Sequence, residues 1–146
     1  MAAKEWRLFT VAQANGVVSV IEPLLARMTT AASRLVQAKT RHDELTEAMR
    51  ANGHGEEALT LQAEIEALVG ELQEVVGTCE EAGVEVKDFE HGIVDFPARY
   101  QGRFIMLCYR PGEGRIRFWH EVDDGFAGRQ PIEALDDETL GGPVQP

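Results

Sequence analysis

Cysteine and basic charge are both scarce in this 146-residue sequence. The two cysteines are too few for the disulfide framework of a small secreted domain, so both are expected as thiols in a reducing cytoplasm. Lys and Arg total 14 against 25 Asp and Glu, and residues 1–83 and 84–146 share the net charge of −11. Because neither half is basic, no nucleic-acid partner is expected.

Long apolar runs and established catalytic motifs are also missing. No stretch approaches the roughly 20 apolar residues that span a bilayer, and residues 1–9 lack the apolar core of a signal peptide. We therefore expect a cytoplasmic protein without membrane contact. There is no His-Glu-x-x-His pattern and no glycine-rich phosphate loop opening a helix. Motifs alone therefore assign neither an enzyme class nor a cofactor, and leave open whether the protein is an enzyme.

The first half of the chain has helical periodicity. Thr10 followed by Gln13 matches a capping box, which marks a helix start. Pro23 removes one helical N–H, so we predict a short helix over 11–21 and a long helix from residue 23.

Two apolar seams indicate an antiparallel, coiled-coil-like helical hairpin within residues 1–83. Apolar residues recur at alternating steps of three and four over 21–49 and again over 58–82. Glycines near 52–55 predict the turn between them. Folding the chain at this turn would place the two seams face to face, with Met28 opposite Cys79. His42 occupies a seam position and would be a polar residue between the helices.

The apolar stripe widens toward the open end of this hairpin, where Val18, Leu25, Ala32 and Val36 flank the seam. A stripe wider than one helix contact needs further cover. The C-terminal unit, a second subunit or both would provide it, and we expect a homo-oligomer, with a dimer favoured.

Residues 84–132 alternate with the period of strands. Ile93 begins a short run that Pro97 is expected to end, and 103–109 and 115–121 are two longer runs. Three or four antiparallel strands packed on the open end of the hairpin are predicted, giving an α+β fold. Residues 133–146 are predicted to form an acidic, flexible tail.

Residues able to bind a metal gather in two short segments of this β unit. Imidazoles and carboxylates together suit a divalent transition metal. The candidate ligands are Asp88, His91, Asp95, His120 and Glu121. The simpler alternative makes His120 a half-buried strand residue, Asp88 a turn cap and the others solvated, with Cys79 and Cys108 as buried core residues.

Arginines form a second group. Arg103, Arg115 and Arg117 lie on strands predicted to pair and could hold a phosphate or carboxylate. The favoured alternative is cross-strand ion pairing with glutamates such as Glu113 and Glu121.

Several motifs together resemble an uncharacterised bacterial family, domain of unknown function 2203. The resemblance covers about residues 8–132. It is carried by residues 9–15, 86–88, 92–97, 107–109, 112–113, 118–121 and 125–132. One departure is Tyr109, where the family usually has tryptophan. The resemblance implies a compact bacterial protein and no particular activity.

Two hypotheses about function follow. The first is a non-enzymatic binding or assembly module that self-associates through its helical hairpin. The alternative is a small metal-dependent hydrolase with an Asp/His/Glu site on the β unit.

Overall fold

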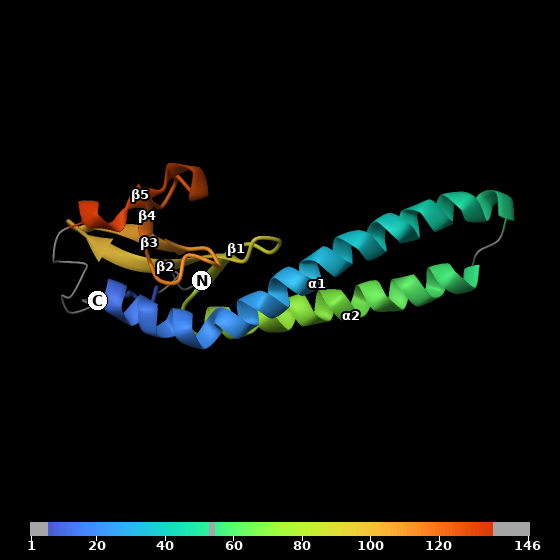
Figure 1. Ribbon diagram of the computed structural model, residues 1–146, viewed down its shortest axis with the longest axis horizontal. Helices are drawn as coiled ribbons and strands as arrows, with labels where there is room; N and C mark the ends of the chain where they lie inside the picture. Colours follow the sequence, from blue (N-terminus) through green and yellow to red (C-terminus); the bar gives the residue numbers. More distant parts are fainter. Residues whose placement is uncertain (1–5, 53–54, 136–146) are drawn as a thin grey trace, which may run out of the picture.

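Two long helices are followed by a five-stranded antiparallel sheet, which confirms the predicted α+β fold (Figure 1). The computed structural model describes residues 6–52 and 55–135. Helix α1 spans Val11–Asn52 and α2 spans Gly55–Glu81. The centre of the predicted turn and the tail beyond residue 135 lie outside the described residues. None of the described helices is long and apolar enough to cross a membrane.

Helix α1 begins at the predicted capping box. The backbone N–H of Gln13 donates to Thr10 Oγ1 at 3.1 Å, and the N–H of Thr10 donates to Gln13 Oε1 at 3.0 Å. The predicted division at Pro23 is wrong, because α1 is one helix with Pro23 inside it. The loss of one helical hydrogen bond is offset by the buried side chains on either side, Ile21 and Leu25. Figure 1 shows the axis of α1 bending in its first half.

Helices α1 and α2 pack seam against seam, as residues of both seams lie in one buried cluster. Two ion pairs join the helices, Arg27 with Glu71 and Arg41 with Glu57, and these residues are spaced equally on both helices. Equal spacing on the two helices is what the predicted antiparallel hairpin requires. The exact pairing of the seam residues stays a prediction.

The strands follow one another in space as they do in the sequence, each antiparallel to its neighbour. The prediction of three or four strands missed a short fifth strand at the edge. The strands are β1 (Glu85–Asp88), β2 (Ile93–Tyr100), β3 (Arg103–Tyr109), β4 (Phe118–Glu121) and β5 (Gln130–Pro131). Two short 3₁₀ turns flank β5, η1 (Phe126–Gly128) and η2 (Ile132–Ala134).

Pro97 does not end strand β2, contrary to the prediction. The pairing of β1 with β2 stops at Asp95, whereas β2 continues along β3 as far as Tyr100. The Pro97 carbonyl accepts the backbone N–H of Phe9 at 2.8 Å. In a strand, the N–H and C=O of one residue point to the same side. The missing N–H of Pro97 therefore faces away from β3, where it interrupts no sheet hydrogen bond.

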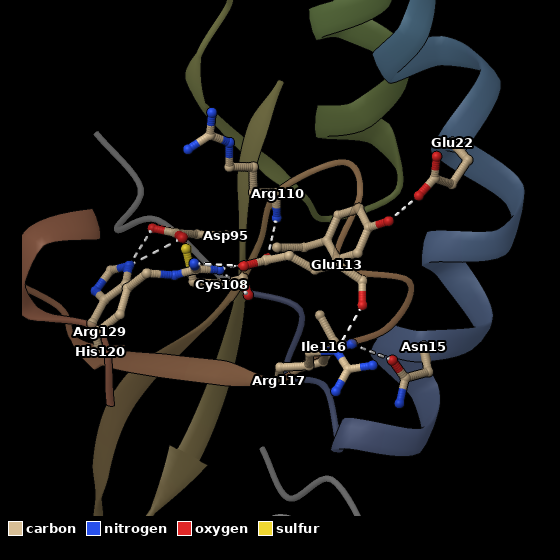
Figure 2. A network of polar contacts seen from close by, with 11 residues as sticks. Asn15, Glu22, Asp95, Cys108, Arg110, Glu113, Ile116, Arg117, His120 and Arg129 are labelled. Atoms are coloured by element: carbon tan, nitrogen blue, oxygen red, sulfur yellow. Dashed lines mark hydrogen bonds and ion pairs between the residues drawn. The ribbon is translucent and has the colours of Figure 1, made fainter. Parts of the chain in front are cut away.

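Strand β4 is shorter than the predicted run over 115–121, because residues 110–117 form a loop fastened to α1. The N–H of Ile116 donates to Asn15 Oδ1 at 2.7 Å, and the Ile116 side chain is buried in the core (Figure 2). The hydroxyl of Tyr109 donates to Glu22 just before this loop. These contacts hold the sheet against the first half of α1.

One face of the sheet packs against the helices and closes the core. Val94, Phe96 and Leu107 on this face join the same buried cluster as Val18, Leu25 and Ala32 from the wide stripe of α1. The chain's own sheet therefore covers Val18, Leu25 and Ala32 of the stripe that suggested a second subunit, whereas Val36 is exposed. The remainder of the hairpin extends beyond the sheet (Figure 1).

Candidate metal centre

Three side chains from three neighbouring strands meet on the face of the sheet that is turned away from the helices. They are Asp95 from β2, Cys108 from β3 and His120 from β4. One oxygen, one sulfur and one nitrogen from them lie within 4.8 Å of one another, and all three residues are buried. Figure 2 shows the Cys108 sulfur beside the Asp95 carboxylate, with the imidazole of His120 facing the carboxylate.

The strand register explains why these residues meet. Asp95 lies directly opposite Cys108, and Cys108 lies opposite Phe118, two residues from His120 on the same face of β4. Strand β3 separates β2 from β4, so these two strands are roughly 10 Å apart. Asp95 and His120 can touch across that distance because the side chain between them, Cys108, is small.

The hydrogen bonds of His120 define its protonation in the metal-free protein. Nδ1 lies 2.7 Å from the carbonyl oxygen of Glu121, and Nε2 lies 3.0 Å from each carboxylate oxygen of Asp95. Both ring nitrogens thus face acceptors, which favours an imidazolium that donates two hydrogen bonds. Burial by itself lowers the pKa of His120, but hydrogen bonds to Asp95, Cys108 and the Glu121 carbonyl raise that pKa to about 10.

The same geometry suits metal coordination once Nε2 loses its proton. A histidine ligand commonly donates its other ring N–H to a backbone carbonyl, as Nδ1 does here toward Glu121. Imidazole, thiolate and carboxylate form a mixed donor set that fits Zn²⁺ and related borderline ions. Three protein ligands leave one tetrahedral position, the arrangement of a metal site that accepts water or a further ligand.

A pocket of about 230 Å³ opens beside Asp95 and His120. Its wall includes Asp123 and Asp124, which follow β4, and Phe126 of η1. A metal bound by the three clustered side chains would therefore be accessible from this pocket.

A tight ion pair fixes the segment that forms the pocket wall. The guanidinium of Arg129 donates to both carboxylate oxygens of Glu113, each at 2.6 Å (Figure 2). It also lies 4.2 Å from the ring centroid of Phe118 and 4.4 Å from that of Phe126. Arg129 also donates to the backbone carbonyl of Cys108 at 3.3 Å. The contact joins η1 and the 110–117 loop to the strand that carries Cys108.

Asp88 and His91 are not part of this cluster. The backbone N–H of His91 donates to Asp88 Oδ1 at 2.9 Å, and the ring Nδ1 lies 3.2 Å from the same carboxylate. These contacts lower the pKa of Asp88, the backbone hydrogen bond contributing most. The pair closes the turn between β1 and β2, as the alternative interpretation of Asp88 predicted. It lies beside a second pocket of about 370 Å³.

Glu121 is also separate from the cluster, because it follows His120 on β4 and points to the other face. It accepts two hydrogen bonds from Arg103, at 2.9 and 2.6 Å, and this contact lowers the pKa of Glu121. Arg117 donates to the carbonyl of Glu113. Arg103 and Arg117 therefore have partners within the protein, as the favoured alternative of ion pairing expected for Arg103, and Arg115 lies in the loop before β4. The anion site at these three arginines stays a prediction.

Sequence reasoning predicted Asp95 and His120 as ligands but treated Cys108 as core. Alternation along residues 103–109 does place Cys108 on one face of its strand. What the pattern could not show is that β3 lies between β2 and β4, because the order of strands in a sheet is not contained in their periodicity. Without that order, no contact between Cys108 and the two other residues could be predicted.

The fold and cluster together define a small α+β protein with a helical hairpin and a buried Asp–Cys–His group on its sheet. Residues 7–132 match the model of a family described as "Uncharacterized conserved protein (DUF2203)", and the chain belongs to that family. The match agrees with the resemblance seen in the motifs. The comparisons with curated proteins and with solved structures gave no match.

Proposed function

We propose that this protein is a binding module for a divalent transition metal, most simply Zn²⁺, held by Asp95, Cys108 and His120. The supporting observation is the convergence of one nitrogen, one sulfur and one oxygen donor within 4.8 Å at a buried point. The earlier ligand set is thereby reduced to Asp95 and His120 and extended by Cys108.

The energetic cost of the cluster supports a functional role. Asp95 and His120 side chains are each only 2% exposed. Desolvating a buried ion pair costs several kcal/mol per ion, and apolar residues of similar volume would often be as stable or more so. A metal ion makes use of both groups, since it would replace the imidazole proton and interact with the Asp95 carboxylate and the Cys108 sulfur.

The test is the metal content and zinc affinity of the native protein and of ligand variants. We expect close to one zinc per chain after loading, and loss of this zinc in Asp95→Asn/His120→Gln. Cys108→Ala provides a second variant with a smaller change in the core. Substitution by Co²⁺ should give absorption bands that depend on Cys108, because a thiolate ligand adds a charge-transfer band to the visible spectrum of tetrahedral Co²⁺.

Asp88→Asn/His91→Gln is the matched control, since it removes the same residue types from the turn outside the cluster. It should keep full zinc content. Zinc retained by folded Asp95→Asn/His120→Gln, or lost equally from the control, would contradict the proposal.

Metal-dependent hydrolysis is the second candidate, favoured by the pocket beside the cluster. A metal-bound water in the open position would be accessible from there, and Asp123 or Asp124 could accept its proton. Glu121, a candidate ligand in the sequence analysis, is not included in this site because it is paired with Arg103. Hydrolysis of p-nitrophenyl esters by the zinc-loaded protein, absent from Asp95→Asn/His120→Gln, would support this candidate.

Self-association through the hairpin stays a prediction. The sheet covers much of the stripe that suggested it, while Val36 and Leu59 are 48% and 70% exposed. Light scattering at tens of micromolar should give a dimer mass if the prediction holds, and a strict monomer would count against it.

A further inference from the structure

Two pockets on the same side of the molecule share part of their walls. The pocket at Asp95 and His120 and the larger one at Asp88 and His91 are both lined by three residues, Lys87, Ile93 and Phe126. Their volumes are about 230 and 370 Å³. A small molecule lying across the shared wall would therefore reach from the metal cluster to the second pocket, within the size range of ordinary ligand sites.

A β-bulge places Lys87 on this shared wall. The register between β1 and β2 shifts between Val86, opposite Val94, and Asp88, opposite Ile93, so Lys87 is the extra residue. Bulges commonly redirect a side chain next to a functional site. The Lys87 ammonium lies 3.9 Å from a carboxylate oxygen of Glu85, a long contact, and its side chain is 47% exposed.

A second cation and an apolar surface lie in the larger pocket. Arg110 lines it, and its guanidinium is 6.0 Å from the ring centroid of Phe126. Among residues 6–52 and 55–135, no carboxylate forms an ion pair with Arg110. Phe126 is 40% exposed, which leaves part of its ring for contact with a ligand.

Charge is therefore divided between the two ends. Asp95, Asp123 and Asp124 line only the smaller pocket, which suits a cation, whereas Arg110 lines the larger one and Lys87 lies on the wall that the two share. Asp88 also lines the larger pocket, where its carboxylate contacts His91 at 3.2 Å.

We propose that the joined pockets bind a small organic oxyanion, a phosphate monoester or a carboxylate. Its anionic group is held by Lys87 and Arg110, and its apolar body lies on Phe126. The other end of the ligand reaches toward the metal at Asp95 and His120. The inference rests on the proposed metal site for that last contact, whereas the anion contact uses residues outside the metal cluster.

Calorimetric titration with phenyl phosphate and with phenylacetate tests the proposal, using both metal-free and zinc-loaded protein. These probes share an aromatic body and distinguish a phosphate from a carboxylate. We expect binding of at least one of them. We also expect binding about tenfold or more weaker in Lys87→Gln/Arg110→Gln, because each lost charge-assisted hydrogen bond weakens binding substantially. The zinc content of this variant should be unchanged.

Lys39→Gln/Arg115→Gln removes the same net charge away from the pockets and should bind the probes as the native protein does. Equal weakening in this control, unchanged affinity in Lys87→Gln/Arg110→Gln, or no binding of either probe would overturn the proposal. If the native protein takes up no zinc, but binds a probe that Lys87→Gln/Arg110→Gln does not bind, the anion site is supported and only the metal site is refuted.

Discussion

Replacing Asp95 by asparagine removes the negative charge beside His120 while keeping the side-chain shape. In metal-free protein at pH 7 we expect this change to lower the free energy of unfolding by about 4 kcal/mol. Asparagine leaves no cavity, so the loss reports mainly on the ion pair. Asp123→Asn, the same chemical change at an exposed carboxylate, should alter stability by less than about 0.5 kcal/mol.

The magnitude follows from proton linkage. The pKa of His120 is about 10 in the folded protein against 6.5 in a model peptide. At pH 7 the folded state therefore holds the proton more favourably than the unfolded state by about 4 kcal/mol. Loss of one partner from a buried ion pair typically costs about 3–5 kcal/mol, which agrees.

The stability difference between native protein and Asp95→Asn should decrease as pH rises. A raised histidine pKa stabilises the folded state fully below pH 6.5, and this contribution disappears as pH rises toward 10. The difference between native protein and Asp95→Asn should therefore shrink from about 4 kcal/mol at pH 7 to under about 1 kcal/mol at pH 10. Urea unfolding followed by circular dichroism, with a chelator present, measures both values. A difference below about 1 kcal/mol at pH 7, or one that is equal at both pH values, would refute the ionised pair.

Three further predictions concern the metal and the packing around it. Zinc uptake at pH 8 should release about one proton or more, because His120 must lose its Nε2 proton. Calorimetry in buffers of different ionisation enthalpy measures this release, and zinc binding without it would contradict the prediction. Arg129→Leu should lower the free energy of unfolding in urea by about 2–3 kcal/mol, because the Glu113 carboxylate loses its guanidinium partner and keeps the Arg110 N–H. A change under about 0.5 kcal/mol would contradict this. Gly92→Ala should cost more than Gly102→Ala in thermal unfolding, because both have positive φ but only Gly92 would place a Cβ 2.9 Å from Pro111; equal costs would count against this contact.

The helical half shows how far local patterns reach. The capping box at Thr10 was predictable because both partners lie within one helical turn. The continuation of α1 through Pro23 was not, since it depends on burial of flanking residues against the sheet.

The candidate site shows the same division. Asp95 and His120 were proposed from their residue types, while Asp88, His91 and Glu121 were included because nothing in the sequence excluded them. Alternation along β4 already separates Glu121 from His120. Separating Asp88 and His91 from the cluster required the turn that pairs them with each other.

By itself, the sequence determined the two helices, the antiparallel β unit and the alternation of each strand, because these depend on neighbours a few residues apart. Only the tertiary structure decided the order of the strands, the position of Cys108 between Asp95 and His120, and the cover of the helical stripe. Those contacts join residues far apart in the chain, and their free energy depends on how whole elements pack. Periodicity within one element carries no record of that packing.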